Sequence, residues 1–337
     1  MSARETIGPL TLDATIERWP LIKPLRITGF AWNTSEVICV HLGFGGQTGR
    51  GEASGVYYRG ERAETMLGQI EALRPEIERG VSREALQALL PVGGARNALD
   101  CALWDLEAKL DSHPVWQIAG MEKPRPLLTT FTCGADSPAA MAATALSYAG
   151  ARAIKLKLTG ESEDAARIQS VRAALPSVGL AVDANQGFTP DSLRALMPAL
   201  QETGVSLIEQ PFPVAQDAWL DGFNSPIPIA ADESVQSFSE MQQLCGRFQV
   251  VNIKLDKCGG LTEALAMARA AHAVGLKPMV GNMTGTSLAM APAFLLGQLC
   301  TIVDLDGPIF LKTDRATPVQ YANGSISCPA ELWGYPC

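Results

Sequence analysis

The spacing of hydrophobic and polar positions changes about a third of the way along the chain. Up to about residue 60 the positions alternate as in antiparallel strands, and an apolar run at 37–42 leads into the glycine-rich stretch 43–49. That stretch predicts a hairpin turn, because it lacks the spacing of a phosphate- or dinucleotide-binding loop and no helix follows it. Apolar residues then recur at helical spacing over 63–78 and 95–110, so this part predicts a small α+β domain.

From residue 124 onward, short apolar strands alternate with helical segments. The predicted strands are 127–132, 153–158, 180–185, 207–211, 227–234, 250–257, 277–283 and 301–306. Eight strand–helix alternations predict the α/β class and a parallel (β/α)₈-type barrel, that is, a modified TIM barrel. The proline-rich stretch 123–126 marks the boundary, which gives a capping domain at 1–123 and a barrel at 124–314. Residues 315–337 are expected to pack back on the cap.

Composition and charge exclude several classes of protein. The chain has 337 residues, of which 47% are hydrophobic, and a formal charge of −8, which disfavours a nucleic-acid or anionic-membrane partner. Residues 1–6 carry no apolar signal-peptide run, and the most apolar stretch, 288–303, is shorter than the about 18 residues of a membrane-spanning helix. The eight cysteines lack Cys-x-x-Cys spacing and the three histidines lie far apart. These features predict a cytoplasmic protein with reduced thiols and no histidine-based chemistry.

Charged residues stand at the ends of six of the eight predicted strands. In a barrel of this kind, the active site lies at the C-terminal ends of the strands. The six strand ends are Lys155-Leu156-Lys157, Asp183-Ala184-Asn185, Glu209-Gln210-Pro211, Asp232-Glu233-Ser234, Lys254-Leu255-Asp256 and Asp304-Leu305-Asp306. Burying unpaired charges is strongly unfavourable. We therefore expect these side chains to converge and neutralise one another around a ligand.

Three carboxylates from consecutive strands form the predicted metal site. Asp183, Glu209 and Asp232 are separated by 26 and 23 residues, which is about one strand–helix unit each. Mg²⁺ takes near-octahedral oxygen ligands and keeps positions for water or substrate, and no His or Cys is in line to favour zinc. The sequence therefore predicts Mg²⁺ at these three carboxylates, with Asn185 and Glu233 as supporting residues.

Two lysines, Lys157 and Lys254, come from strands on opposite sides of the predicted barrel. They can face a substrate from its two sides, which is the geometry for removing a proton from one face of a carbon and returning it to the other. Mg²⁺ would hold the substrate carboxylate and stabilise the enediolate formed when the α-proton leaves. Lys155 shares a strand face with Lys157, and its like charge is expected to lower the pKa of Lys157. Asp256 is expected to share a face with Lys254 and to orient it.

Asp304 and Asp306 form a second group of carboxylates. Two residues apart on an extended strand, they are expected to point the same way. Such a pair can bind a metal ion or an ammonium group. Because the other three carboxylates make the better metal site, the pair is expected to bind a positively charged group of the substrate.

These strand ends, together with Cys258-Gly259-Gly260 and the helical stretch 96–105, resemble the muconate-lactonizing subgroup of the enolase superfamily over nearly the whole chain. The resemblance implies a capped barrel, Mg²⁺ as cofactor and an isomerase that uses two-lysine 1,1-proton transfer. The strand end Gly281-Asn282-Met283 lacks the histidine base of the mandelate-racemase branch, and Asn282 and Met283 are expected to contact the substrate.

Asp304-Leu305-Asp306 is similar to the Asp-x-Asp of the dipeptide epimerases within that subgroup. This similarity implies an L-Ala-X dipeptide as substrate, with its ammonium at the acidic pair and the Cα of its second residue between the lysines. Lys155 is also expected near the substrate. The expected dipeptide is L-Ala-D/L-Glu, from the recycling of cell-wall peptides.

The cap stretch 28–33 departs from the glutamate-preferring members, which carry an arginine there. Here it is uncharged and aromatic, and Arg26 and Arg59 are the nearby cations. Either Arg26 or Arg59 binds an acidic second residue, or Trp32, Tyr57 and Tyr58 favour a larger or apolar one, or these aromatic side chains simply pack within the cap. The residues alone leave all three interpretations open.

Other functions fit the same barrel. A cycloisomerase, an o-succinylbenzoate synthase or an N-acyl amino acid racemase would act on substrates without a free ammonium, and the acidic pair counts against them. A Schiff-base aldolase and a metal-stabilised binding protein are rivals from other classes. The expected partner is a small-molecule dipeptide, and the sequence leaves a homo-oligomer open.

Overall fold

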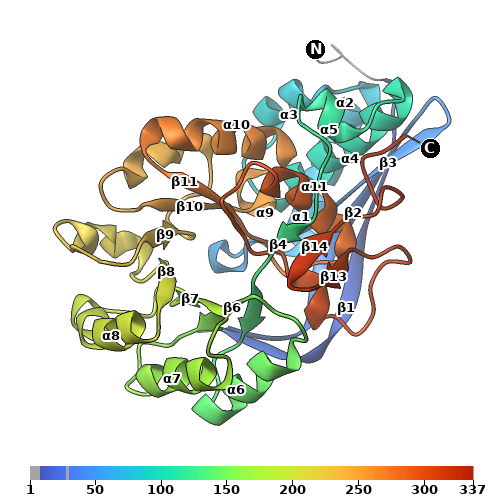
Figure 1. The fold of residues 1–337 in the computed structure, drawn as a ribbon. Helices are drawn as coiled ribbons and strands as arrows, with labels where there is room; N and C mark the ends of the chain where they lie inside the picture. The colour runs from blue at the N-terminus through green and yellow to red at the C-terminus, as the bar shows by residue number, and fades with distance from the viewer. Residues whose placement is uncertain (1–7, 28–29, 337) are drawn as a thin grey trace.

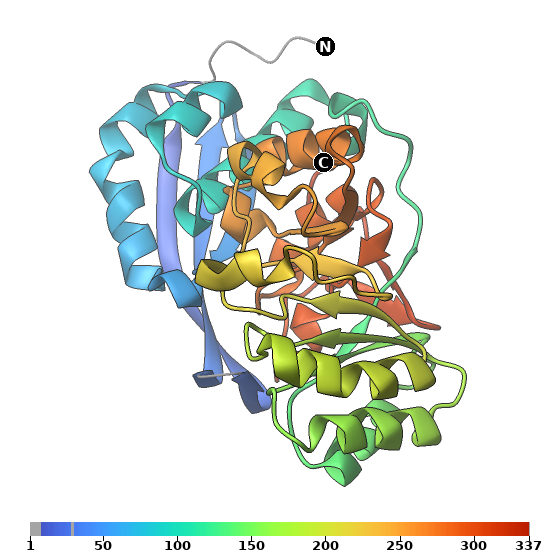
Figure 2. The same cartoon turned by 90° about the vertical axis from the view of Figure 1, so that its left-hand side faces the viewer.

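The molecule combines a parallel barrel with a smaller sheet-and-helix cap that stands along one side of it (Figure 1, Figure 2). This computed structural model describes residues 8–27 and 30–336, without the side chains at 25–27. In Figure 2 the blue and cyan cap lies beside the yellow, orange and red part of the barrel. The cap contains the N-terminal strands and the helices that follow them.

The cap begins with an antiparallel sheet of β1 (Thr11–Ile27), β2 (Phe30–Phe44) and β3 (Gln47–Ser54), paired in that order. Gly45 and Gly46, both with positive φ, form the two-residue turn between β2 and β3. Glycine reaches this backbone region without the steric cost of a side chain, so the predicted hairpin is confirmed.

Helices cover one face of the cap sheet. They are α1 (Ala63–Ala72), α2 (Arg74–Arg79), α3 (Arg83–Leu89), α4 (Gly94–Asp111) and α5 (Val115–Ile118), preceded by the 3₁₀ turn η1 (Tyr57–Arg59). The single helix predicted at 63–78 is instead broken at Leu73, because Pro75 lacks a backbone N–H and opens a new helix. Leu99, Leu103 and Leu106 of α4 are buried in the cap core, as their spacing predicts.

Eight parallel strands form the barrel: β5 (Phe131–Cys133), β6 (Ala153–Lys157), β7 (Gly179–Asp183), β8 (Val205–Glu209), β9 (Ile229–Ala231), β10 (Val250–Ile253), β11 (Lys277–Val280) and β12 (Ile302–Val303). They pair in chain order. The backbone N–H of Thr130 donates to the carbonyl of Val303 at 3.1 Å, which brings the two edge strands together. The predicted α/β class and barrel-type architecture with an α+β cap are therefore confirmed.

The crossovers differ in part from the prediction. Five are the α-helices α6 (Pro138–Ser147), α7 (Asp164–Ala174), α8 (Pro190–Glu202), α10 (Leu261–Ala271) and α11 (Ser287–Gly297), but two are the 3₁₀ segments η2 (Val214–Leu220) and η3 (Phe238–Leu244). In η2 the chain is confined between Pro213 and the Asp221-Gly222 turn, and Gln216 is non-helical. Short 3₁₀ pieces suit such brief connectors. None of the helices within the described ranges has the length and apolar character needed to cross a membrane.

The barrel interior explains why chemistry gathers at one end. Ala181, Leu207, Ala230, Val250 and Met279 form an apolar layer inside it. Side chains alternate across a strand, so the residue two positions further on faces the interior again, one layer higher. That rule places a charged or polar group above each of several layer residues.

The C-terminal segment contacts both parts of the molecule. Strands β13 (Gln320–Ala322) and β14 (Ser325–Ser327) form a small sheet with β4 (Leu127–Leu128), next to the barrel. Trp333 Nε1 donates to the carbonyl of Arg50 in the cap at 2.9 Å. The Arg315 guanidinium lies 2.6 Å from both Glu17 and Glu52 of the cap sheet.

Replacing Arg315 by alanine is expected to destabilise the fold. The Glu52 side chain is fully buried, and removing its cation leaves a buried charge without compensation. Such a loss costs about 3–5 kcal/mol. Urea unfolding followed by circular dichroism should show a lower midpoint at an unchanged slope. Arg247→Ala is the control: it removes an exposed pair with Asp221, and exposed pairs contribute only about 0–1 kcal/mol. Equal destabilisation by the two variants would contradict the assignment.

Candidate active site

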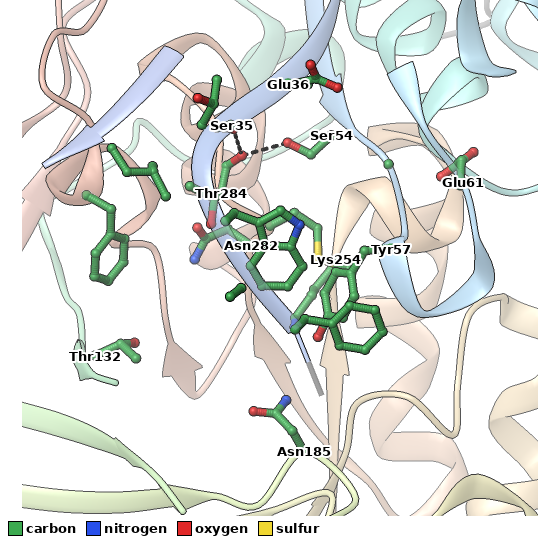
Figure 3. Close-up of a pocket in the computed structure, with 18 of the residues that line it drawn as sticks. Ser35, Glu36, Ser54, Tyr57, Glu61, Thr132, Asn185, Lys254, Asn282 and Thr284 are labelled. Atoms are coloured by element: carbon green, nitrogen blue, oxygen red, sulfur yellow. Dashed lines mark hydrogen bonds between the residues drawn. The ribbon is translucent and has the colours of Figure 1, made fainter. Parts of the chain in front are cut away.

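A cavity of about 670 Å³ lies at the C-terminal ends of the barrel strands, where the cap faces them (Figure 3). Among the predicted site residues, those that line it are Trp32, Lys155, Lys157, Asn185, Lys254, Asn282, Met283, Asp304 and Asp306. Two cap serines tie the cap to the loop after β11, because Ser35 and Ser54 both donate to the carbonyl of Thr284, at 2.5 and 2.7 Å. The cavity is thus formed jointly by the cap and the barrel.

The three predicted metal ligands converge below this cavity. Asp183, Glu209 and Asp232 are buried, and each offers a carboxylate oxygen within 4.8 Å of the others. They follow the interior residues Ala181, Leu207 and Ala230 by two positions, which is why they point inward. The sequence pattern and the tertiary structure therefore give the same three residues.

The electrostatics of this cluster suit a divalent cation. Burial and the neighbouring Asp183 charge raise the pKa of Glu209 to about 7. Glu209 Oε2 is buried without a hydrogen-bond partner and lies 3.5 Å from Lys155 Nζ. Three carboxylates crowded in this way need positive charge, and an all-oxygen donor set is the kind that Mg²⁺ prefers. The residues present therefore fit Mg²⁺.

The two lysines flank the cluster from opposite sides. Lys157 Nζ donates to Asp183 at 2.6 Å and Lys254 Nζ donates to Asp232 at 2.6 Å. Strands β6 and β10, which lead to them, are four apart in the eight-stranded order and so lie across the barrel. Burial disfavours the charge on Lys254, but Asp232 and Glu209 outweigh burial and raise its pKa well above the usual value. Positive charge at the cluster would oppose that increase.

Asp304 and Asp306 lie on another wall of the cavity, together with Lys155. Strand β12 ends at Val303, before the predicted 306, yet both carboxylates line the cavity and the intervening Leu305 is buried in the core. Lys155 Nζ donates to Asp304, and the Thr132 N–H donates to Asp306 at 2.6 Å. Burial and the Asp304 charge raise the pKa of Asp306 to about 6. Two carboxylates and one ammonium leave one negative charge, which suits a second ammonium.

The two predicted supporting residues, Asn185 and Glu233, form a chain of hydrogen bonds with Lys157 beside the carboxylate cluster. Asn185 accepts from Lys157 Nζ at 2.9 Å and donates to Glu233 at 3.3 Å. Burial and the Asp232 charge raise the pKa of Glu233 to about 8, and its Oε2 lacks a hydrogen-bond partner. Asn185 is therefore placed to orient the Lys157 ammonium group.

The prediction that Asp256 shares a strand face with Lys254 is wrong. Strand β10 ends at Ile253, and the chain turns into the short helix α9 (Leu255–Cys258). Asp256 instead accepts from the Ser54 N–H at 2.9 Å and from the Asn97 amide at 3.1 Å. It joins the barrel to the cap, because the helical turn rotates its side chain away from Lys254.

Sequence reasoning missed three buried residues beneath the site. Lys257 Nζ donates to Asp232 at 2.6 Å, Asn252 donates to Glu209 at 2.7 Å, and Gln210 Oε1 accepts from the Asp232 N–H at 3.0 Å. Asn252 could have been found, since it follows the interior residue Val250 by two. Lys257 could not, because its approach depends on α9.

The cap wall of the cavity is aromatic. Phe30, Trp32 and Tyr57 line it, and Tyr58 packs edge-on against Tyr57 with ring centroids 5.2 Å apart. Tyr58 and Arg59 do not line the cavity, although both lie in the described part of the chain, and Arg59 is exposed to solvent. Residues 28 and 29 of the predicted loop, and the Arg26 side chain, lie outside the described part.

A capped parallel barrel with convergent carboxylates and two opposed lysines at its strand ends is a barrel of the enolase type. Residues 11–120 match the mandelate racemase / muconate lactonizing enzyme N-terminal domain, and residues 138–332 match the enolase C-terminal domain-like family. The chain therefore belongs to the mandelate racemase / muconate lactonizing enzyme family of the enolase superfamily, as its motifs predict.

Three known proteins are similar to the chain over most of their length. It is 40% identical over 320 residues to L-Ala-D/L-Glu epimerase of Escherichia coli (strain K12), covering 94% of this chain and 99% of that protein. It is 41% identical over 278 residues to N-acetyl-D-glutamate racemase of Pseudoalteromonas sp., covering 81% and 87%. A crystal structure of an enolase family member from Agrobacterium tumefaciens, with homology to dipeptide epimerases and with bound sodium and L-Ala-L-Glu, has a TM-score of 0.93 at 39% identity, covering 97% and 100%.

Proposed function

We propose that the chain is a Mg²⁺-dependent dipeptide epimerase, an isomerase that inverts the Cα of the second residue in an L-Ala-X dipeptide. The observation that carries the proposal is the presence of Asp304 and Asp306 in the same cavity as Lys157 and Lys254. A dipeptide has an ammonium at one end and a carboxylate at the other. The acidic pair suits the first group and a metal at the three carboxylates suits the second. The names of the Escherichia coli relative and the Agrobacterium structure support this substrate class.

The chain's own residues divide the work. Asp183, Glu209 and Asp232 would hold Mg²⁺, which when bound supplies positive charge to the substrate carboxylate as the α-proton leaves. Lys157 and Lys254 remove the proton on one face and return one on the other. Asn282 donates to the Asp304 carbonyl at 2.6 Å and so steadies the acidic pair. Lys155 pairs with Asp304, and Met283 offers an apolar contact beside the lysines.

An N-acyl amino acid racemase is the second candidate, favoured by the 41% identity to N-acetyl-D-glutamate racemase. The same lysines and carboxylates would serve that reaction. Its substrate has no free ammonium, however, so the excess negative charge at Asp304 and Asp306 would have no partner. The acidic pair therefore discriminates between the two candidates.

Replacing Asp304 and Asp306 by asparagine is expected to lower kcat/KM for L-Ala-X dipeptides strongly. Loss of one partner from a buried charge pair costs about 2–5 kcal/mol, or about 30- to 5,000-fold. In the unmodified protein, KM should rise as the pH falls through about 6, because a carboxyl with the raised pKa of Asp306 becomes neutral there. Both effects are measured as deuterium incorporation at the Cα of X in D₂O, by mass spectrometry.

The matched control is Asp221→Asn, which neutralises an exposed carboxylate in the turn after η2. It should leave exchange unchanged. N-acetyl amino acids are tested in parallel. If they exchange faster than free dipeptides, and the double variant exchanges them normally, the N-acyl racemase is favoured and the dipeptide epimerase is contradicted.

A cytoplasmic location and the domain division also belong to the proposal. The seven described cysteines are free thiols, which supports a reducing compartment. The two family matches end at 120 and begin at 138, which supports a boundary near 123. A role in recycling cell-wall peptides would require X to be glutamate, so the cap wall that faces X decides that point.

A further inference from the structure

Four aromatic side chains form one cluster in the cap, composed of Phe30, Trp32, Tyr57 and Tyr58. Phe30 and Trp32 stack with centroids 5.6 Å apart and planes 2° apart, and both meet Tyr57 edge-on, at 4.7 and 4.9 Å. Phe30 nevertheless keeps 41% of its surface exposed. Aromatic surface that lines a cavity is typical of a site that binds an apolar group.

This cluster belongs to the same cavity as the reacting groups. Trp32 and Tyr57 line it together with Lys157 and Lys254, and Figure 3 shows Tyr57 projecting into it close to Lys254. A substrate held by its ammonium at Asp306 and by its carboxylate at the metal ligands has its second Cα between the lysines. Its side chain would then point toward the cap, because an apolar layer fills the barrel interior below the site.

The charges on the cap wall disfavour an acidic side chain. Among the described cap residues that line the cavity, the charged ones are Glu36, Glu61 and Arg62. Glu36 is paired with Arg18 at 2.7 Å, and Glu61 accepts from the N–H groups of Val56 and Gly94. Arg62 is exposed at the rim. Both carboxylates therefore already have partners, and a substrate carboxylate at this wall would face chiefly the negative faces of the aromatic rings, with Arg62 at the rim.

We infer that the aromatic cluster is the specificity pocket for the second residue and that it selects a large apolar or aromatic side chain over glutamate. The inference rests on the proposed dipeptide epimerase function and narrows its substrate class. Trp32 and Tyr57 contact the side chain, whereas Tyr58 packs edge-on against Tyr57. Aromatic rings packed edge-on are rigid, so they offer a preformed apolar surface.

The test compares kcat/KM of the Mg²⁺-loaded protein for L-Ala-L-Phe, L-Ala-L-Leu, L-Ala-L-Glu, L-Ala-L-Lys and L-Ala-L-Ala. L-Ala-L-Phe and L-Ala-L-Leu should exceed L-Ala-L-Glu and L-Ala-L-Lys. Trp32→Ala should lower kcat/KM for L-Ala-L-Phe at least about 10-fold. The loss of one small apolar group in a pocket already costs about 10- to 200-fold. It should leave L-Ala-L-Ala nearly unchanged, because that substrate does not reach the wall, and Trp32→Phe should restore most of the loss.

Trp219→Ala is the matched control, because Trp219 is 38% exposed on η2 and does not line the cavity. It should leave kcat/KM unchanged for every dipeptide tested. Preference for L-Ala-L-Glu over L-Ala-L-Phe would overturn the inference and leave the epimerase function intact. Loss of that preference in Arg62→Ala would assign the recognition of glutamate to Arg62. Equal loss for L-Ala-L-Ala and L-Ala-L-Phe in Trp32→Ala would also overturn the inference, by showing a structural effect. Exchange of no dipeptide at all would contradict the proposed function itself.

Discussion

Replacing Lys254 by methionine is expected to abolish epimerisation while preserving α-proton exchange of one of the two dipeptide epimers. In the proposed reaction Lys254 carries the proton on one face of the substrate, and methionine keeps its length but cannot transfer a proton. General acid–base groups contribute about 10²–10⁴-fold, so epimerisation should fall by at least that much. Lys157 on the opposite side stays intact, and the epimer whose α-proton faces it should still exchange in D₂O. Lys157→Met should give the mirror pattern, with the other epimer exchanging.

The measurement is deuterium incorporation starting separately from the L,L and L,D dipeptides, together with polarimetry for net epimerisation. Lys277→Met is the control, because Lys277 is exposed at the start of β11, at the other end of the barrel strand. It should behave like the unmodified protein. Exchange of both epimers in both single variants would rule out opposed lysines as the proton carriers.

Removing the metal, or one of its proposed ligands, is the second change with a very large expected effect. Chelation by EDTA should eliminate exchange, and added Mg²⁺ should restore it. In Glu209→Gln the side chain keeps its shape but loses a charge at the centre of the cluster, where Oε2 has no hydrogen-bond partner. Three carboxylates become two, so Mg²⁺ affinity should fall steeply and excess Mg²⁺ should fail to restore exchange.

Mg²⁺ binding is measured directly by titration calorimetry, so that a loss of affinity is separated from a loss of chemistry. Mg²⁺ should also raise the Tm of the unmodified protein, since a ligand that binds only the folded state stabilises it. Glu202→Gln, an exposed change at the end of α8, should bind Mg²⁺ normally. Full exchange by the unmodified protein in EDTA would contradict the metal assignment.

The barrel and its charged end could be predicted because both follow from local rules. Ala181 and Asp183 lie on one strand face whatever the rest of the chain does, and the same holds for Leu207 and Glu209. Once eight such strands close, their C-terminal ends must meet. The carboxylate cluster, the opposed lysines and the acidic pair could therefore be predicted without knowledge of tertiary contacts.

The sequence-based predictions were wrong where the backbone departs from regular strand or helix geometry. Asp256 was misplaced because α9 follows β10 at once, and a helical turn does not keep the alternation of a strand. The same turn brings Lys257 to Asp232, which no strand pattern could indicate. Pro75 divides one predicted helix, and the connection after β8 forms only the 3₁₀ segment η2, in which Gln216 is non-helical. Each departure depends on a local break that hydrophobic periodicity does not register.

The sequence by itself determined the barrel, the three carboxylates and the two lysines, because alternation along a strand fixes which side chains face inward. It also placed Asp304 and Asp306 together. Only the tertiary structure decided what the cap presents to the substrate. Trp32 and Tyr57 come from β2 and η1, and no periodic rule relates them. Their convergence over Lys254, and the exclusion of Arg59 from the cavity, depend on how the cap packs on the barrel through long-range contacts such as that between Ser54 and Thr284.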